Sequence, residues 1–96
     1  MYTPDIQSKE EFLSRFERLF NYFDKKKIKT EAESMLFNTR IIRVKDYIEK
    51  GTPLTSPKEV YKNTLIFFEM PGGWKLMESD IGKEATDLLY YFVQNY

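Results

Sequence analysis

The 96 residues of this chain include no cysteine and no histidine. Without cysteine there is no disulfide scaffold, no thiolate zinc site and no cysteine nucleophile. Without histidine the chain also lacks the commonest general base and the commonest metal ligand. Only carboxylates, lysine and tyrosine remain as candidates for side-chain catalysis.

Long apolar runs are missing as well. The two longest are LIFF at 65–68 and LLYYFV at 88–93, far short of the roughly 20 residues that span a bilayer. The first residues, MYTPDIQSKEEF, are polar and acidic, which is not the pattern of a signal peptide. We therefore expect a cytoplasmic protein with no membrane contact.

The carboxylates that could carry chemistry have a simpler explanation. Most acidic pairs stand where helices are expected to begin, and there negative charge offsets the helix macrodipole. Glu84 and Asp87 lie one helical turn apart, a spacing that also suits a solvated face. Gly72-Gly73 lacks the lysine and hydroxyl residue of a phosphate-binding loop. The sequence therefore predicts no enzyme, no cofactor and no metal.

Aromatic residues are abundant, with 8 Phe, 7 Tyr and 1 Trp, and the formal net charge is zero. A chain of this length forms one domain, here residues 1–96, with one modest core. Phe and Tyr, which have AT-rich codons, are more numerous than Gly (4) and Pro (4), which have GC-rich codons. This bias suggests a low-GC bacterium or one of its phages or mobile elements.

Capping residues or a proline at the first helical position predict the start of a helix in three places. Ser8 and Thr30 each begin a capping box, and the spacing that follows predicts helices over about 9–25 and 31–50, the second ending at Gly51. Part of 31–50, the segment TRIIRVKDYI, also fits a strand. Ser56 followed by Pro57 predicts a third start near 57. A last helix is expected from Ser79 or Asp80 to about Asn95.

The segment between the third start and Ser79 has two interpretations. The helix from 57 might run on to Met70. Alternatively it ends near Asn63, and TLIFFEM (64–70) pairs with 74–78 as a hairpin across a Pro71-Gly72 type II turn. We favour the hairpin. The predicted fold is mainly α, a bundle of three or four helices with a short hairpin near 64–78.

The apolar C-terminal segment, which includes LLYYFV at 88–93, suggests a binding surface. Ala85, Leu88, Leu89 and Phe92 suffice for a core-facing stripe, which leaves two tyrosines and Val93 directed elsewhere. Such surplus apolar surface marks interaction sites on small proteins, where Tyr, Trp and Met are enriched. We therefore predict that a protein target or a second copy of the chain is bound by Trp74, Met77, Tyr90, Tyr91 and Tyr96. Two alternatives are that the last helix lies centrally in the bundle and that Trp74 belongs to the core.

Positive charge gathers in one part of the chain. Residues 25–50 hold eight basic and four acidic side chains, a net charge of +4, and both flanking parts are acidic. A lysine-rich connector leading into a helix can follow phosphates. The alternative prediction is thus a nucleic-acid site built from Lys25, Lys26, Lys27, Lys29, Arg40 and Arg43, although such a run is also an ordinary solvated loop.

The segment GGWKLMESDIGKEATDLLYYF resembles the end of winged-helix regulators. There a wing strand leads through a glycine turn into a C-terminal helix, and the matching features are Gly72-Gly73, the alternation Trp74/Leu76, and Gly82 with the apolar helix behind it. The resemblance covers about 20 residues and implies a nucleic-acid-binding regulator. The long helix at 31–50 departs from the family, which has a short helix and a basic recognition helix before the wing.

The function expected first is a small non-enzymatic binding protein. It would act as an inhibitor or adaptor, encoded by a phage or mobile element and directed at a host enzyme or defence complex. Its mechanism would be steric occlusion through an aromatic-centred interface, with acidic side chains adding electrostatic steering. A small winged-helix-like regulator of nucleic acid is the alternative.

Overall fold

Helix α1 (Lys9–Lys25) begins and ends where the sequence predicts. In the computed structural model, which describes residues 2–96, the backbone amide of Glu11 donates to the Ser8 hydroxyl at 3.1 Å. The Glu11 carboxylate accepts from the amide of Gln7 rather than from the cap residue itself. One face of the helix is buried, through Phe12, Phe16, Leu19 and Phe23.

The second predicted helix is helical throughout and consists of three parts. They are α2 (Glu31–Leu36), a π-helical turn η1 (Phe37–Ile41) and α3 (Ile42–Lys50). Both bonds of the predicted capping box form between Thr30 and Glu33. Gly51 closes the helix in the left-handed conformation with φ of +70°. The strand alternative for this segment is therefore wrong, because its buried residues follow one helical stripe, Phe37, Ile41 and Val44.

Residues 57–70 form neither one long helix nor a strand. They make two 3-10 helices, η2 (Lys58–Lys62) and η3 (Leu65–Glu69), and Ser56 does not cap the first. The buried side chains explain the break. Tyr61 and Phe67 are both almost fully buried, but six residues apart in one α-helix they would point about 120° apart. Two short helices with a bend between them bring both rings into the core.

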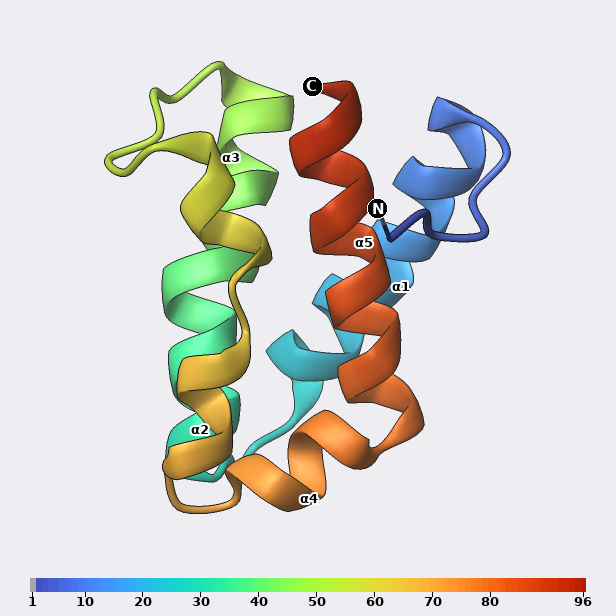
Figure 1. Cartoon of the computed structure of the whole chain (residues 1–96). Helices are drawn as coiled ribbons and strands as arrows, with labels where there is room; N and C mark the ends of the chain where they lie inside the picture. The colour runs from blue at the N-terminus through green and yellow to red at the C-terminus, as the bar shows by residue number, and fades with distance from the viewer. Residues whose placement is uncertain (1) are drawn as a thin grey trace.

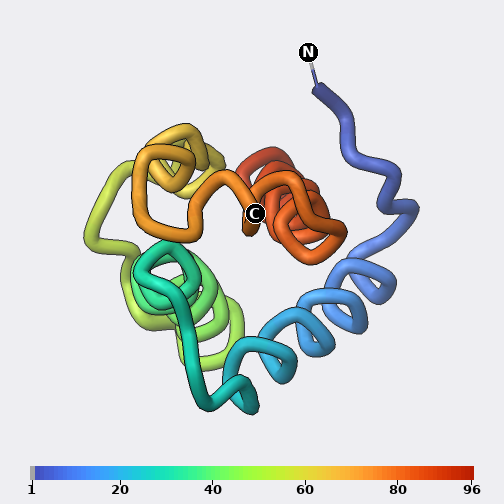
Figure 2. Tube along the Cα trace, turned by 90° about the horizontal axis from the view of Figure 1, so that it is seen from below, coloured from blue at the N-terminus to red at the C-terminus, as the bar shows by residue number. Residues whose placement is uncertain are grey.

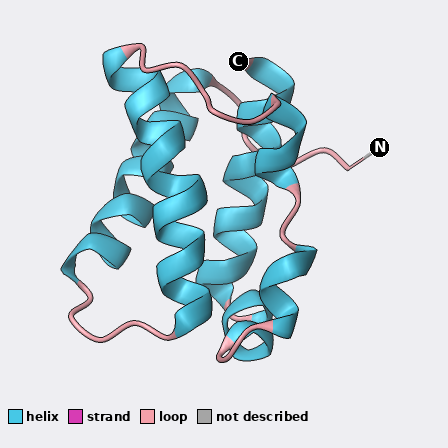
Figure 3. Cartoon of the chain, turned by 90° about the vertical axis from the view of Figure 1, so that its left-hand side faces the viewer, coloured by secondary structure: helices cyan, strands magenta, loops and turns pink. Residues whose placement is uncertain are grey.

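The predicted type II turn at Pro71-Gly72 is present, but it joins helices. Gly72 has φ of +81° and ψ of 0°, and the amide of Gly73 donates to the carbonyl of Met70 at 2.8 Å. The chain continues into α4 (Gly73–Glu78). Leu76 and Met77 are buried side by side in sequence, which a half-buried strand does not allow. The hairpin at 64–78 is wrong, and residues 2–96 contain no strand (Figure 3).

Helix α5 (Asp80–Asn95) occupies a central position. It begins at the Ser79 cap, whose hydroxyl accepts from the amide of Gly82 at 3.2 Å. It contacts α1, η2 and α4 (Figure 1), so several of its sides are covered. Leu88, Leu89 and Phe92 are fully buried, and Val93 is nearly so. The predicted mainly α bundle is thus confirmed.

Figure 2 looks roughly along the long helix α2–η1–α3, along the pair η2 and η3, and along α5, and it shows α1 running obliquely past them. Arg15 ties α1 to α5, because its Nε and Nη2 donate to the two oxygens of Glu84 at 2.9 and 2.6 Å. That bond raises the pKa of Arg15 above its usual range. In the part of the chain that the structure describes, no helix has both the length and the apolar character needed to cross a bilayer.

Candidate protein-binding surface

The most exposed large apolar side chains of the molecule include three on η3 and α4. The exposed fractions are 74% for Leu65, 53% for Ile66 and 65% for Trp74. Phe68, also on η3, meets the indole of Trp74 edge to face, with centroids 4.8 Å apart. We call these four residues the η3–α4 surface. Single exposed apolar residues are ordinary, but a cluster of them is typical of an interaction site.

The 3-10 geometry of η3 creates this exposure. Residues three apart eclipse one another in a 3-10 helix, so Leu65 and Phe68 share one side and Ile66 and Glu69 another. The third side carries Phe67, which is 1% exposed and belongs to the core. The run LIFF therefore buries one of its members deeply, and its remaining apolar side chains lie at or near the surface.

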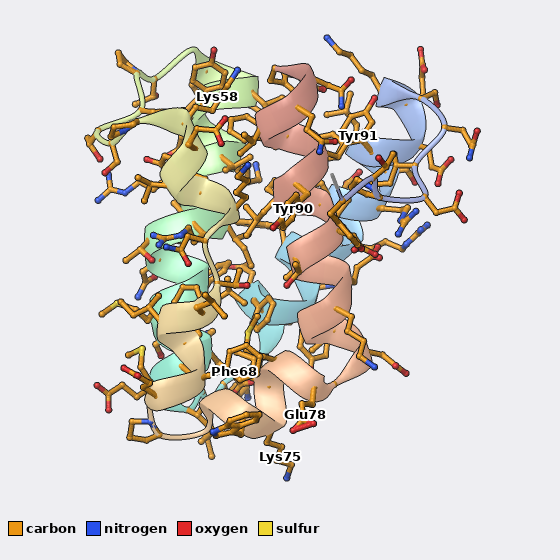
Figure 4. The ribbon with its side chains drawn as sticks, in the orientation of Figure 1. Lys58, Phe68, Lys75, Glu78, Tyr90 and Tyr91 are labelled. Atoms are coloured by element: carbon orange, nitrogen blue, oxygen red, sulfur yellow. The ribbon has the colours of Figure 1, made fainter. Side chains whose placement is uncertain are left out.

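A groove runs beside this surface, between η3 and α5. Phe68 and Tyr90 lie on the two facing elements (Figure 4), and the buried Met77 contributes from α4. The volume is about 490 Å³. Its other lining residues are Tyr2, Thr64, Lys83, Thr86 and Asp87. An aromatic and thioether lining with polar groups at the rim suits an apolar side chain of a partner.

The N-terminal arm forms one edge of the groove. The ring of Tyr2 packs edge to face on Tyr90 at 4.9 Å, and its hydroxyl donates to the carboxylate of Asp87. The backbone carbonyl of Tyr2 accepts from Gln94 Nε2 at 2.9 Å. The bond to Asp87, together with partial burial, raises the pKa of Tyr2 to about 12. These contacts attach the arm to α5.

The structure brings together three of the five predicted partner-binding residues. Trp74 is exposed beside the groove, Tyr90 lines it, and Met77 lies beneath it. Tyr91 is only 9% exposed and stacks on Phe12, so it belongs to the core. It leaves α5 on a different side from Tyr90 (Figure 4). For much of the apolar C-terminal segment, the alternative that α5 lies centrally in the bundle is thus the correct one.

Tyr96, the fifth predicted residue, packs away from the groove. Its ring lies against those of Phe12 and Phe92, with centroids 5.5 and 5.6 Å apart, and the Lys9 ammonium lies 4.5 Å from its centroid. Partial burial raises the pKa of its hydroxyl. Sequence reasoning also missed Leu65, Ile66, Phe68 and Tyr2. The unbroken LIFF run was the available signal, because four consecutive residues cannot all face one core.

The basic connector does not form a continuous row of free cations. Lys25 and Lys27 are exposed. Lys26 pairs with the buried carboxylate of Glu33, and Lys29 donates to the carbonyl of Lys26 at 2.8 Å. Burial opposes the charge on Glu33, but the bonds from Lys26 and from the amide of Thr30 outweigh it and lower the pKa of Glu33. Two of the four predicted connector lysines, Lys26 and Lys29, are thus engaged in bonds within the protein.

The two arginines of the alternative site differ sharply. Arg43 is exposed, whereas Arg40, in the π-helical turn η1, is partly buried, with its Nε fully covered. The Arg40 guanidinium lies 5.8 Å from the centroid of Tyr61 and 5.4 Å from that of Phe67. Burial lowers its pKa, although an arginine stays charged at any physiological pH. Their spacing of one helical turn suggests that Arg40 and Arg43 lie side by side on one exposed face. The structure does not present them in that way.

The wing implied by the winged-helix resemblance is absent from the structure. Gly72 and Gly73 do form a turn, but Trp74 and Leu76 belong to α4 instead of alternating along a strand. A Cβ on Gly73 would lie 1.6 Å from the carbonyl oxygen of Phe67, so this glycine allows α4 to begin directly against η3. The same turn thereby places Trp74 beside Phe68.

Comparisons with models of known protein families, with curated proteins and with solved structures found no match for this chain.

Proposed function

We propose that this protein is a binding module that recognises another protein through the η3–α4 surface and the adjoining groove. The observation that carries the proposal is the exposure of Leu65, Ile66 and Trp74, at 74%, 53% and 65%, on two elements that contact each other. Leaving such side chains in water is unfavourable by about 25 cal/mol per Å² of apolar area. Covering them with a partner recovers that free energy.

The surroundings of the surface support a specific contact. Trp74 is held by its edge-to-face contact with Phe68, and the type II turn at Gly72 fixes where α4 begins. A rigid aromatic side chain loses little conformational freedom on binding, which is why Trp and Tyr dominate interface energetics. The groove next to it offers a place for an apolar side chain of the partner.

The mechanism we propose is occlusion. A domain of this size covers a partner patch of the standard interface class, about 800 Å² on each side, and thereby blocks whatever else binds there. The protein would serve as an inhibitor or adaptor. The idea that it is encoded by a phage or mobile element and directed at a host enzyme or defence complex belongs to this proposal and rests on residue usage alone.

The test is affinity capture from a lysate of the cells that make the protein, with and without nuclease. The variant Leu65→Gln/Trp74→Gln removes two of the four residues of the η3–α4 surface. Its matched control is Leu13→Gln/Tyr22→Gln, which replaces an aliphatic and an aromatic residue of α1 that are 43% and 45% exposed. Helix α1 lies diagonally across the bundle from η3 (Figure 2).

We expect the parent and the control to retain the same protein after nuclease treatment. The surface variant should retain at least about tenfold less, because losing a central aromatic residue typically weakens binding by 2 kcal/mol or more. Equal retention by both variants contradicts the proposal. Loss of the captured material on nuclease treatment would instead favour a nucleic-acid function.

A further inference from the structure

Arg40 carries a charge for which the fold supplies no counterion. Among residues 2–96, no ion pair includes it. Its Nε is buried without a hydrogen-bond acceptor. Buried charges in proteins are normally paired, because an unpaired one loses hydration without compensation. Arg40 is partly buried, its Nε has no acceptor, and its charge has no carboxylate partner within residues 2–96, so a counterion from another molecule would complete the site.

The two Nη groups of the guanidinium make only long contacts with oxygen atoms of the protein. Its Nη1 lies 3.3 Å from the Thr39 hydroxyl and 3.5 Å from the Thr39 carbonyl, and its Nη2 lies 3.5 Å from the carbonyl of Asn63. Good N–H···O bonds span about 2.7–3.2 Å. The Nη groups thus keep donor capacity, and a planar guanidinium presents it in the fork that a carboxylate matches.

The guanidinium is held in place even though it is not paired. It packs against the rings of Tyr61 and Phe67, and the π-helical turn Phe37–Ile41 sets where its backbone lies. Such π-helical turns occur frequently at functional sites. Because the side chain is already ordered, little conformational entropy remains to be lost when an anion binds.

The location connects Arg40 to the η3–α4 surface. Asn63, whose carbonyl is next to Nη2, also accepts a bond from the amide of Leu65 at 3.3 Å through its side chain. Leu65 is the most exposed member of that surface. Arg40 and Leu65 thus share Asn63 as a neighbour, so a single partner molecule is able to contact both.

We propose that Arg40 is the anion site of the η3–α4 surface and receives a carboxylate from an aspartate or glutamate of the protein partner. This inference rests on the proposed function and adds the chemistry of the partner, an acidic side chain close to apolar ones. Such an arginine, partly buried and packed against aromatic rings, is typical of interface hot spots.

A phosphate backbone fits the site less well. Nucleic acid is bound by rows of cations that together neutralise several phosphates. Arg40 is a single charge, Lys26 and Lys29 of the connector are engaged within the protein, and the cation of Lys62 is paired with Glu59 at 2.8 Å. One isolated guanidinium matches one carboxylate.

The first test needs no knowledge of the partner. The full chain, labelled with ¹⁵N in its arginines, is titrated with N-acetyl-Leu-Glu-Leu-amide and, separately, with the matched peptide that has Gln in place of Glu. We expect the Arg40 Nε–H resonance to shift with saturation only for the Glu peptide. Inorganic phosphate and sodium chloride at equal ionic strength serve as further titrants. Identical responses to the two peptides, or saturation by phosphate alone, would overturn the proposal.

The second test separates binding from a structural role. Arg40→Met keeps an unbranched apolar stem against the two rings and removes the unpaired charge, whereas Arg43→Met removes an exposed arginine one turn along the helix. We expect Arg40→Met to unfold at the same temperature as the parent or higher, and to lose at least tenfold in capture of the partner. Arg43→Met should leave the capture unchanged. A lowered unfolding temperature for Arg40→Met would make the arginine structural and overturn the proposal.

The two proposals fail in different ways. If capture of the partner does not respond to Leu65→Gln/Trp74→Gln, the proposed surface is wrong, whatever the peptide titration shows. If capture responds to that variant but not to Arg40→Met, the surface is supported and the anion site is rejected.

Discussion

The rings of Phe12 and Tyr91 stack with their centroids 5.0 Å apart and their planes 22° from parallel. This contact joins α1 to α5 and shows why the last helix is apolar on several sides. α5 also contacts η2 and α4, so the tyrosine that the sequence assigned to a partner faces its own first helix. The exposed apolar side chains that we propose for binding lie instead on η3 and α4.

Tyr91→Ala tests this contact. Removing a buried aromatic side chain typically costs 3–5 kcal/mol; because Tyr91 retains 9% exposure, we expect about 3 kcal/mol in the free energy of unfolding. Urea denaturation followed by circular dichroism measures it. Tyr90→Ala is the neighbouring control, expected to cost about 1 kcal/mol because Tyr90 lies at the surface groove. Equal losses would mean that Tyr91 is not part of the core.

Glu33→Gln tests the buried ion pair and its pH dependence. The pKa of Glu33 is lowered from 4.5 in the folded state, so the stability it contributes is complete above about pH 4.5 and lost as the pH falls through the folded pKa. Glutamine keeps an acceptor for the amide of Thr30 but loses the charge facing Lys26. We expect Glu33→Gln to cost about 1–2 kcal/mol at pH 7, since Lys26 remains partly exposed.

The pH series supplies the control for this prediction. Urea midpoints of the parent and of Glu33→Gln should converge as the pH falls below about 4.5 and through the lowered pKa of Glu33, where the carboxylate of the parent becomes protonated. A difference that stays constant over this range would show that the loss comes from packing rather than from charge.

Asp87→Asn tests how the N-terminal arm is attached. The folded-state pKa of Tyr2 is raised from 10.0 to about 12 by the bond to Asp87, so the attachment is present below pH 10 and lost as the pH rises through about 12. With asparagine in place of Asp87, the pKa of Tyr2 should return toward 10. The ¹³Cζ shift of Tyr2 in an NMR titration reads this value directly. An unchanged pKa would mean that the arm is held by Tyr90 and Gln94 alone.

Gly73→Ala tests the close approach of α4 to η3. An added Cβ would lie 1.6 Å from the carbonyl oxygen of Phe67, a backbone atom that has no rotamer to change. We expect a loss of about 3 kcal/mol, the upper part of the range for overpacking. Gly51→Ala is the control: its φ is +70° but its surroundings are open, so it should cost about 1 kcal/mol. Thermal unfolding compares the two, and equal losses would contradict the packing at Gly73.

Sequence patterns predicted the elements whose signals are local. The caps at Ser8, Thr30 and Ser79 and the stop at Gly51 all depend on residues within one turn, and each helix boundary there was placed correctly. The Pro71-Gly72 turn was also identified by type. The prediction that this turn connects two strands was wrong, because a type II turn fits between strands and between helical segments alike.

The candidate binding surface could be predicted only in part, because burial is a property of the whole bundle. The sequence predicts Trp74, Tyr90 and Tyr91 alike as partner-binding residues. Only the position of α5 between α1 and η2 decides which side of α5 is covered. Arg40 and Arg43 look equivalent in sequence. The π-helical turn and the neighbouring rings of Tyr61 and Phe67 separate them, and neither leaves a local signal.

The last prediction concerns the η3–α4 surface in the absence of any partner. Leu65→Ser/Ile66→Thr/Trp74→Arg changes three side chains that are more than half exposed. Surface substitutions of this kind usually alter the free energy of unfolding by less than 0.5 kcal/mol each, so the unfolding temperature should stay within a few degrees of the parent. The exposed apolar area, however, should fall sharply.

Native-state binding of the dye ANS, which reports exposed apolar surface, measures that area. We expect clear fluorescence enhancement with the parent and several-fold less with the triple variant at equal concentration. A control that replaces Leu13 by Ser on α1 should keep the parental signal. If the triple variant instead unfolds several degrees earlier, these side chains contribute to the core, and a surface kept for a partner would no longer account for their exposure. If it is equally stable and binds less dye, the fold does not need them, and their apolar character calls for a role outside the fold.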